Sequence, residues 1–311
     1  MTMLKWITKD TNIDFMKARK FTYLLSGILI ILSCLSIYFK SFNFGIDFSG
    51  GVLMEIKSEQ AINVEEIRSK LSVLNLDELN LQTIGENGDE LMIRAQAENA
   101  DEAAQRKAVV DIKEILGNGY EYRRVENVGP QVGDELKRAG IIASVLAMLA
   151  IAIYIWIRFE WQFALGALVG LFHDIIVTVG LLSFFRFDFS LTTIAALLTL
   201  VGYSINDTVV TYDRIRENLK KYRKMPQLDL LNKSINDIFS RTILTGITTL
   251  IAVIPLYIWG GEALSSFSFT ILVGLIIGTY SSIYVCTAFL NLFDLRAVEH
   301  KDEDNYFGTI G

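Results

Sequence analysis

Two ionisable residues inside apolar stretches are the strongest candidates for chemistry in this sequence. Asp207 lies within the run 202–210, and Arg241 opens the apolar run 241–250. A charged side chain at the centre of a membrane helix costs on the order of 3 kcal/mol or more. Proteins keep such residues where they face a bundle interior, pair with one another or relay ions. The Asp207–Arg241 pair is therefore the first place to look for function.

The spacing of nearby charges places these two residues at comparable depth. Asp207 precedes Asp213 by six residues, about 9 Å of helix, and Arg241 follows Asp237 by four, about 6 Å. If their helices are adjacent and antiparallel, the side chains could meet, and a change in their separation would change the proton affinity of the carboxylate. Coupling of proton passage to a conformational change is one hypothesis. The other is a static buried salt bridge that only fixes helix packing.

Further polar residues flank the two candidates. On a helix, Tyr203 and Asn206 fall on the same face as Asp207, and Thr245 falls on the face of Arg241. Such faces would suit a water-accessible path. We therefore add Asn206 to the candidate proton path and treat Tyr203 and Thr245 as accessory candidates.

A second polar pair, His173 and Asp174, lies in another apolar run. Gly166, Gly170 and Asp174 recur every four residues, which predicts a close helix–helix contact that carries a carboxylate. His173 could titrate near neutral pH and join a proton relay. A hydrogen-bonded packing pair is the interpretation that we favour for His173.

The composition is typical of a membrane protein rather than a soluble domain. Of the 311 residues, 51% are hydrophobic and 21% are charged, and the mean hydropathy is +0.37. The sequence has no GxxxxGK(S/T), HExxH or CxxC motif and only two histidines, so we expect neither ATP hydrolysis nor a metal enzyme. We expect no cofactor, no enzymatic activity and no nucleic-acid partner.

Apolar runs that are long enough to cross a bilayer predict six transmembrane helices. The first run is too long for a cleaved signal peptide and lacks a small-x-small cleavage site, which favours an uncleaved anchor. The six predicted spans are approximately 21–39, 140–159, 163–184, 189–211, 241–259 and 267–292.

Basic residues gather on one side of these spans, which by the positive-inside rule places both termini in the cytoplasm. They precede the first span, fill the connection at about 212–240 and follow the last span. We assign the charge run 213–224 to topology rather than to ligand binding. The basic residues that mark the cytoplasmic side are Lys5, Lys9, Lys17, Arg19, Lys20, Arg158, Arg214, Arg216, Lys220, Lys221, Arg223, Lys224, Lys233, Arg296 and Lys301.

The region between the first and second spans is too long and too polar for a membrane loop, so it predicts an extracytoplasmic domain. Its patterns predict strands at 44–57, 79–84, 90–95 and 120–125 and helices at 64–74 and 100–116, with a bend at Gly50-Gly51. The order βαββαβ is the ferredoxin-like arrangement.

The predicted fold class is therefore an α-helical membrane protein of six transmembrane helices with one α+β domain between the first two. The predicted divisions are the N-terminus with the first helix (1–39), the extracytoplasmic domain (40–138), a five-helix region with a cytoplasmic loop (139–295) and a cytoplasmic tail (296–311).

Short motifs along nearly the whole chain resemble those of the SecF family. The segment FGIDFSGG at 44–51 resembles the family's FGxDFxGG signature, and VGPQVGDEL at 128–136 resembles its VGPxVGxEL. His173-Asp174 matches an HD motif in the third span, and the segment 202–218 is similar to the fourth-span motif. Arg241 falls where the family has its fifth-span arginine. No motif position departs from the family pattern.

This resemblance implies a subunit of the bacterial SecDF protein-export complex, of the RND superfamily, in the cytoplasmic membrane. In that family SecF pairs with SecD and associates with the SecYEG channel, often with YajC. The proton gradient then helps to draw unfolded preproteins outward after SecA has pushed them in, and the proton-path residues carry over to Asp207 and Arg241. Two alternatives are a small-molecule or lipid exporter subunit of the same superfamily and a passive scaffold of the Sec channel.

Overall fold

The computed structural model describes residues 11–74, 76–84, 87–97 and 102–296. Lys5, Lys9 and Lys301, part of the predicted hairpin turn and nearly all of the predicted C-terminal tail lie outside these ranges. The chain divides into two compact units, one formed by residues 1–42, 144–187 and 192–311 and the other by residues 43–143 and 188–191. We call them the membrane unit and the sheet unit.

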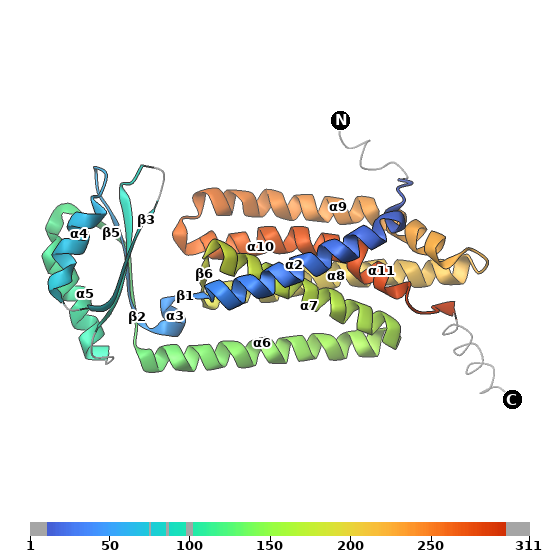
Figure 1. Cartoon of the computed structure of the whole chain (residues 1–311), viewed down its shortest axis with the longest axis horizontal. Helices are drawn as coiled ribbons and strands as arrows, with labels where there is room; N and C mark the ends of the chain where they lie inside the picture. The colour runs from blue at the N-terminus through green and yellow to red at the C-terminus, as the bar shows by residue number, and fades with distance from the viewer. Residues whose placement is uncertain (1–10, 75, 85–86, 98–101, 297–311) are drawn as a thin grey trace. The chain divides into compact units, whose positions relative to one another are not determined.

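Six helices in the described part of the chain are long and apolar enough to cross a membrane, which confirms the predicted fold class. The last one changes its hydrogen-bonding pattern near its end, where a π-helical turn is inserted. Their bounds are α2 Arg19–Lys40 with the short η1 Phe15–Ala18 before it, α6 Pro130–Arg158, α7 Trp161–Phe185, α8 Leu191–Lys221, α9 Gln227–Trp259, and α10 Glu262–Tyr280 continued by η4 Ser281–Cys286 and α11 Thr287–Leu290 (Figure 1).

The connection between α8 and α9 differs from the predicted loop at about 212–240. Both helices continue through it, and only residues 222–226 separate them. Ile215 and Ile235 are buried in the core of the membrane unit, and Asn218 donates a hydrogen bond of 2.9 Å to the Ser234 hydroxyl. The charges that suggested a loop are the polar face of an amphipathic helical hairpin, because its apolar positions recur at helical spacing.

The sheet unit has the predicted ferredoxin-like arrangement. Its sheet has the order β3-β4-β2-β5 with every neighbouring pair antiparallel, and α4 and α5 cover one face of it (Figure 1). The bounds in chain order are β2 Gly51–Lys57, α4 Val64–Leu71, η2 Ser72–Leu74, β3 Leu76–Ile84, β4 Glu90–Ala97, α5 Glu102–Leu116, η3 Gly117–Gly119 and β5 Glu121–Val128.

Alternating side chains of β2 build the core of the sheet unit on both faces. Val52 and Met54 are fully buried and lie in one apolar cluster with Ile67 of α4. Leu53 belongs to a separate cluster with Ile46. Both faces of this central strand are therefore covered, as the period-2 geometry of a strand allows.

The predicted strand at 44–57 is interrupted more strongly than a bend would require. Asn43–Phe44 forms β1, Ile46–Ser49 forms the helical turn α3, and β2 begins only at Gly51. Gly50 and Gly51 have φ values of +73° and +115°, conformations that side chains rarely adopt. The two glycines therefore let the chain pass from a helical turn into a central strand, which alternation of apolar residues alone could not reveal.

Gly51→Ala is expected to destabilise the protein by about 1–3 kcal/mol, because a strained φ would be combined with a clash. A Cβ at this position would lie 2.8 Å from the Ala95 main-chain oxygen. Gly117→Ala is the matched control, since Gly117 also has positive φ, +70°, but faces open space. Urea unfolding of the detergent-solubilised protein measures both. Equal losses of stability would contradict the role assigned to the Ala95 contact.

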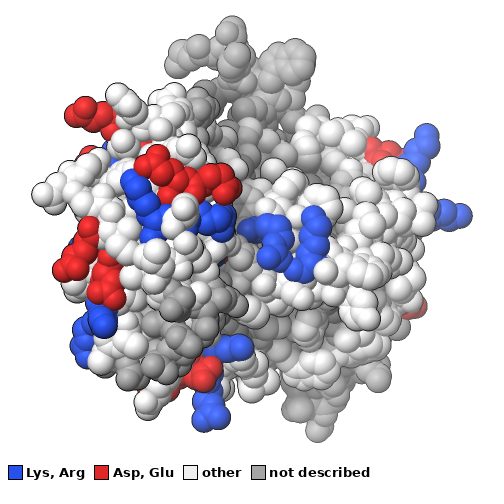
Figure 2. Space-filling view, turned by 60° about the vertical axis from the view of Figure 1, so that its left-hand side comes forward, with Lys and Arg blue, Asp and Glu red and all other residues white. Residues whose placement is uncertain are grey.

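Charges of both signs share the surface of the sheet unit, and Figure 2 shows blue and red side chains next to one another on the face drawn. Lys57 pairs with Asp89 at 3.2 Å and with Glu90 at 3.0 Å. The hydrogen bond from Lys57 lowers the pKa of Asp89, so the stability it contributes is present at neutral pH and is lost as pH falls through that lowered value. Solvent screens such surface pairs, so the apolar core contributes more than they do to the stability of this fold.

Candidate functional site

Asp207 is buried on α8 with only one of its two carboxylate oxygens hydrogen-bonded. Its side chain is 8% exposed, and Oδ1 accepts a hydrogen bond of 2.9 Å from the Thr242 hydroxyl on α9. Oδ2 is also buried and has no hydrogen-bond partner among the described residues. A buried polar atom without a partner costs on the order of 1–3 kcal/mol, more if the group is charged. This buried carboxyl group is therefore only half satisfied by the described residues.

Arg241 does not pair with Asp207 in this structure. The two helices are adjacent, as the Asp207–Thr242 hydrogen bond requires, but the neighbouring Arg241 side chain is exposed. No ion pair joins the two side chains within 4 Å in the part of the chain that is described. Thr242, the residue after Arg241, contacts Asp207 in its place. Consecutive residues on a helix are about 100° apart around its axis.

The other residues expected on these faces are divided between different surroundings. Asn206 is exposed and Tyr203 is half-buried, whereas Asp207 is buried. Thr245 is exposed, and its hydroxyl donates to the main-chain oxygens of Arg241 and Thr242 at 3.0 and 2.9 Å. The structure therefore does not gather these residues around the Asp207 carboxylate.

His173 and Asp174 lie together in the interior of the membrane unit. Both side chains are at most 2% exposed, and His173 Nδ1 lies 2.9 Å from Asp174 Oδ1. Asp174 Oδ2 accepts hydrogen bonds from the Ser204 hydroxyl at 2.5 Å and from the Ser281 hydroxyl at 2.8 Å. His173 Nε2 is buried without a hydrogen-bond partner among the described residues.

Hydroxyl groups extend this cluster toward Asp207. Ser204 and Thr208 are one turn apart on α8, and Thr208 Oγ1 lies 2.9 Å from the hydroxyl of Ser282 in η4. Thr208 is also the residue after Asp207. We call the set His173, Asp174, Ser204, Thr208, Ser281 and Ser282 the polar seam.

The π-helical turn η4 supplies two of the seam's hydroxyl groups and is packed closely on α7. A Cβ on Gly170 would lie 2.1 Å from Cys286 Sγ, and one on Gly166 would lie 2.6 Å from the Tyr212 hydroxyl. This is the close contact that the glycine spacing predicts. The Thr287 hydroxyl donates a hydrogen bond of 2.9 Å to the Ser282 main-chain oxygen in this turn. Such π-bulges are frequent at functional sites.

The sequence pattern missed most of the groups that contact the two buried acids. Ser204, Ser281 and Thr242 are the hydroxyl donors to Asp174 and Asp207, yet small and hydroxyl residues are common on any packed membrane helix. The spacing of Gly274, Gly278 and Ser282, every four residues, is typical of a packed helix face. It gave no sign that the serine hydroxyls would point at a carboxylate.

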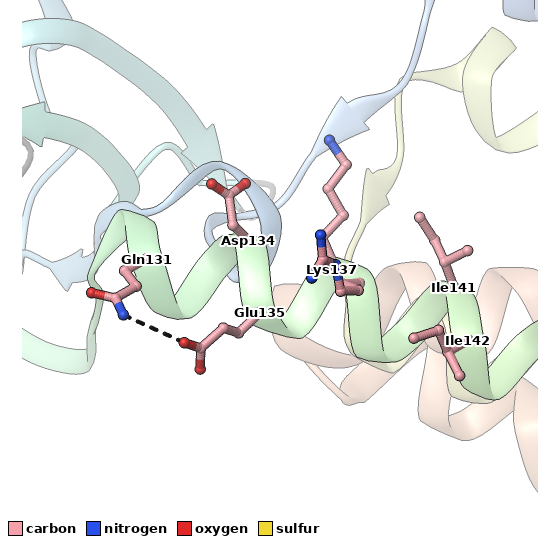
Figure 3. Close-up of a pocket in the computed structure, with 7 residues that line it drawn as sticks. Gln131, Asp134, Glu135, Lys137, Ile141 and Ile142 are labelled. Atoms are coloured by element: carbon pink, nitrogen blue, oxygen red, sulfur yellow. Dashed lines mark hydrogen bonds between the residues drawn. The ribbon is translucent and has the colours of Figure 1, made fainter.

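Two hollows lie apart from the polar seam. One of about 670 Å³ runs along the first turns of α6, where Figure 3 shows Gln131 hydrogen-bonded to Glu135 at 3.5 Å. Acidic, basic and apolar side chains share its lining, with no group of donors or acceptors that converges on one point. The other, about 400 Å³, is an apolar groove between α2 and α7. In the described ranges no cluster of three His, Cys, Asp or Glu residues could hold a metal ion.

Comparison with known families decides where the chain belongs. A model for the C-terminal region of the SecD/SecF protein export membrane proteins matches residues 109–296, and a model for the SecD/SecF GG motif matches residues 36–62. The chain belongs to the SecD/SecF family. The chain is thus a multi-pass membrane protein of this family, with six candidate membrane helices among its described residues.

Curated SecD/SecF relatives match almost end to end. The chain is similar to the protein translocase subunit SecF of Rickettsia rickettsii (strain Sheila Smith), with 44% identity over 96% of this chain and 97% of that protein. It is also similar to the protein of the same name from Rickettsia bellii (strain OSU 85-389), with 45% identity over 95% and 98%.

Solved SecDF structures match the fold over most of the chain. The crystal structure of the translocon-associated membrane protein SecDF from Thermus thermophilus aligns with a TM-score of 0.82 at 33% identity and covers 91% of this chain. A structure of SecDF in a super-membrane-facing form gives a TM-score of 0.67 at 33% identity over 95%. This chain spans 39% and 40% of those two chains, about two fifths of each.

Proposed function

We propose that this chain is a SecF subunit that pairs with SecD and uses the proton-motive force to assist Sec-dependent protein translocation across the bacterial cytoplasmic membrane. Its SecD/SecF family membership and its end-to-end similarity to translocase subunits support this role. Since the chain spans only about two fifths of the solved SecDF chains, SecD would supply the remaining part of the assembly.

The observation that carries the proton-coupled part of the proposal is the state of Asp207. This acid lies inside a membrane-spanning helix, with one oxygen hydrogen-bonded to Thr242 and the other buried without a partner in the described part of the chain. Intramembrane ionisable groups that are incompletely paired are typical of ion pathways. A proton on Oδ2 would remove the charge, and its departure would restore an unpaired acceptor.

Arg241 gives the charged form of Asp207 an alternative partner. It adjoins Thr242, so a rotation of α9 by one residue would exchange the hydroxyl for the guanidinium beside the carboxylate. Loss of the proton would favour that exchange and proton uptake would reverse it, because the ion pair has value only for the charged acid. Proton binding would thus be linked to the positions of α8 and α9, which is the requirement for a proton-driven step.

The proposed setting follows the distribution of charges and the family. Both termini and the α8–α9 hairpin would lie in the cytoplasm, with the sheet unit outside. The SecYEG channel would be the site of action, with YajC as a further partner, SecA as the motor that acts before this step, and unfolded preproteins as substrates. The subunit would have no enzymatic activity of its own.

Translocation into inverted vesicles tests this proposal. Vesicles that contain SecYEG, SecA and SecD are compared with and without this chain, each with and without a proton gradient. We expect the chain to increase preprotein translocation only when the gradient is present. An equal increase without the gradient would favour the passive scaffold, the alternative that the Thr242 hydrogen bond supports because it partly satisfies Asp207 without a proton.

Arg241→Lys is expected to remove most of the gradient-dependent stimulation, by roughly fivefold or more. Lysine keeps the charge but not the planar fork that binds a carboxylate at two points. Arg158→Lys is the matched control, because Arg158 is an exposed arginine at the end of α6 that pairs with Asp213 at 2.8 Å. The vesicle assay measures both. Wild-type stimulation in Arg241→Lys would remove the partner exchange from the mechanism.

A further inference from the structure

The short segment between α7 and α8 is attached to the sheet unit. Its strand β6, Asp188–Phe189, pairs in parallel with β1, Asn43–Phe44 (Figure 1). The Gly45 N–H donates a hydrogen bond of 2.9 Å to the Phe189 main-chain oxygen. Asn43 Nδ2 donates a hydrogen bond of 2.6 Å to Asp188 Oδ1, and Arg94 of β4 forms an ion pair with the same carboxylate. We call this β1–β6 pairing the strap.

Asp47 extends the strap to the first residue of α8. Its Oδ2 accepts a hydrogen bond of 2.9 Å from the main-chain N–H of Leu191, 144 positions away in the sequence. The first N–H groups of a helix have no partner within the helix, so an acceptor from another element stabilises its start. For Leu191 this acceptor comes from α3, inside the segment that matches the SecD/SecF GG motif.

Aromatic packing reinforces these polar contacts. Phe44 and Phe189, which are paired across the strap, have ring centroids 6.2 Å apart, and Phe48 lies 6.3 Å from each. A Cβ on Gly45 would lie 3.2 Å from Ser190 Cβ, so the two backbones approach closely. Residues 188–191 are therefore held by main-chain, ionic and aromatic contacts at once.

The helix that Asp47 caps is the helix that carries Asp207. Leu191 and Asp207 are sixteen residues apart on α8, about 24 Å along one continuous helix. A helix without a break transmits a shift or rotation along its axis, since its hydrogen bonds resist local change. A displacement caused by protonation of Asp207 would therefore reach the strap.

We propose that Asp47 and the strap form a fixed linkage that couples α8 to the sheet unit, with Asp47 as a positioning residue. The GG-motif segment then serves as the attachment by which the proton-linked helix moves the outer domain. This inference rests on the proposed function in assuming that Asp207 changes its protonation state. Coupling of this kind is reciprocal, so it can be measured at the sheet unit without an export assay.

Hydrogen exchange measures the coupling directly in the complex with SecD. Asp207→Asn mimics the uncharged acid, and we expect it to change the exchange rate of strap and sheet-unit amides by about tenfold relative to wild type. In an Asp47→Ala background the same change should disappear. Asp47→Asn is the matched control, because its side-chain oxygen can still accept from Leu191, and it should preserve the effect.

Two outcomes of that comparison would overturn the linkage. One is an unchanged exchange rate in Asp207→Asn, and the other is a full effect that survives in Asp47→Ala. The export assay separates the two failures. Gradient-dependent export together with either of these outcomes contradicts the linkage alone, whereas an exchange effect that requires Asp47 without gradient-dependent export contradicts the proposed function alone.

A cross-link tests whether the strap stays closed. Asn43 and Asp188 are directly paired, so Asn43→Cys with Asp188→Cys in a Cys34→Ser background should form a disulfide on oxidation. We expect the oxidised form to keep the Asp207→Asn effect on sheet-unit exchange, with the reduced form as its own control. Loss of the effect on oxidation would show that the strap must open and would overturn the fixed linkage.

Discussion

Asp207→Asn is expected to abolish the gradient-dependent part of preprotein translocation, a loss of roughly tenfold or more, while the complex with SecD still assembles. The amide has nearly the shape of the carboxyl group and can still accept the hydrogen bond from Thr242. It cannot take up or release a proton at the working pH, so a pathway that passes through this side chain stops. The measurement is translocation into vesicles that contain SecYEG, SecA and SecD, with and without a proton gradient.

The control for Asp207→Asn removes a different acid from the same helix. Asp213 lies six residues further along α8 and pairs with Arg158 at the surface, so Asp213→Asn removes a charge but no buried group. We expect it to keep nearly all of the stimulation. If Asp207→Asn responds to the gradient as wild type does, at equal complex yield, the buried acid is structural and the passive scaffold becomes the better explanation.

The six spans and the βαββαβ order could be predicted because they depend on local patterns. Apolar runs of sufficient length leave few alternatives in a bilayer, where backbone polar groups must be satisfied within the segment. In the sheet unit, Met54 and Ile56 alternate with Glu55 and Lys57, and this period of two is visible without any partner strand. The helical spacing of Val64, Ile67 and Leu71 is equally local.

The α8–α9 hairpin shows where a local pattern misleads. Charged residues beyond position 211 suggested a loop, but they share the helices with Ile215 and Ile235, which are buried. Whether a charged segment is a loop or the polar face of a helix depends on the surface it packs against. That surface is provided by residues distant in the sequence.

The contacts of the candidate site could not be predicted for a related reason. One residue of rotation decides whether Thr242 or Arg241 faces Asp207, and apolar periodicity on α9 does not fix that angle. The Asp47–Leu191 hydrogen bond joins positions 144 apart, so no spacing rule could have suggested it. The π-helical turn that orients Ser281 and Ser282 likewise has no signature in this sequence.

Asp174→Leu is expected to destabilise the membrane unit by about 2 kcal/mol, since hydrogen bonds between membrane helices contribute about 0.6 kcal/mol each and three would be lost. Ser204, Ser281 and His173 all depend on this carboxyl group as their shared partner. A loss of this size lowers the ratio of folded to unfolded protein about thirtyfold. Unfolding in mixed detergent micelles measures it, with Asp174→Asn expected to lose less than half as much because one acceptor oxygen remains.

Thr178→Val separates the hydrogen bonds of Asp174 from general effects of substitution in this interior. Thr178 is fully buried on the same helix, but its hydroxyl has no hydrogen-bond partner among the described residues, so its removal should be close to neutral. Function then discriminates between the two interpretations of the His173–Asp174 pair. A packing pair predicts that Asp174→Asn, once folded, keeps its response to the proton gradient. Loss of that response at normal stability would place Asp174 in the proton path. The polar seam that contains Asp174 also contains Thr208, the residue next to Asp207 on α8.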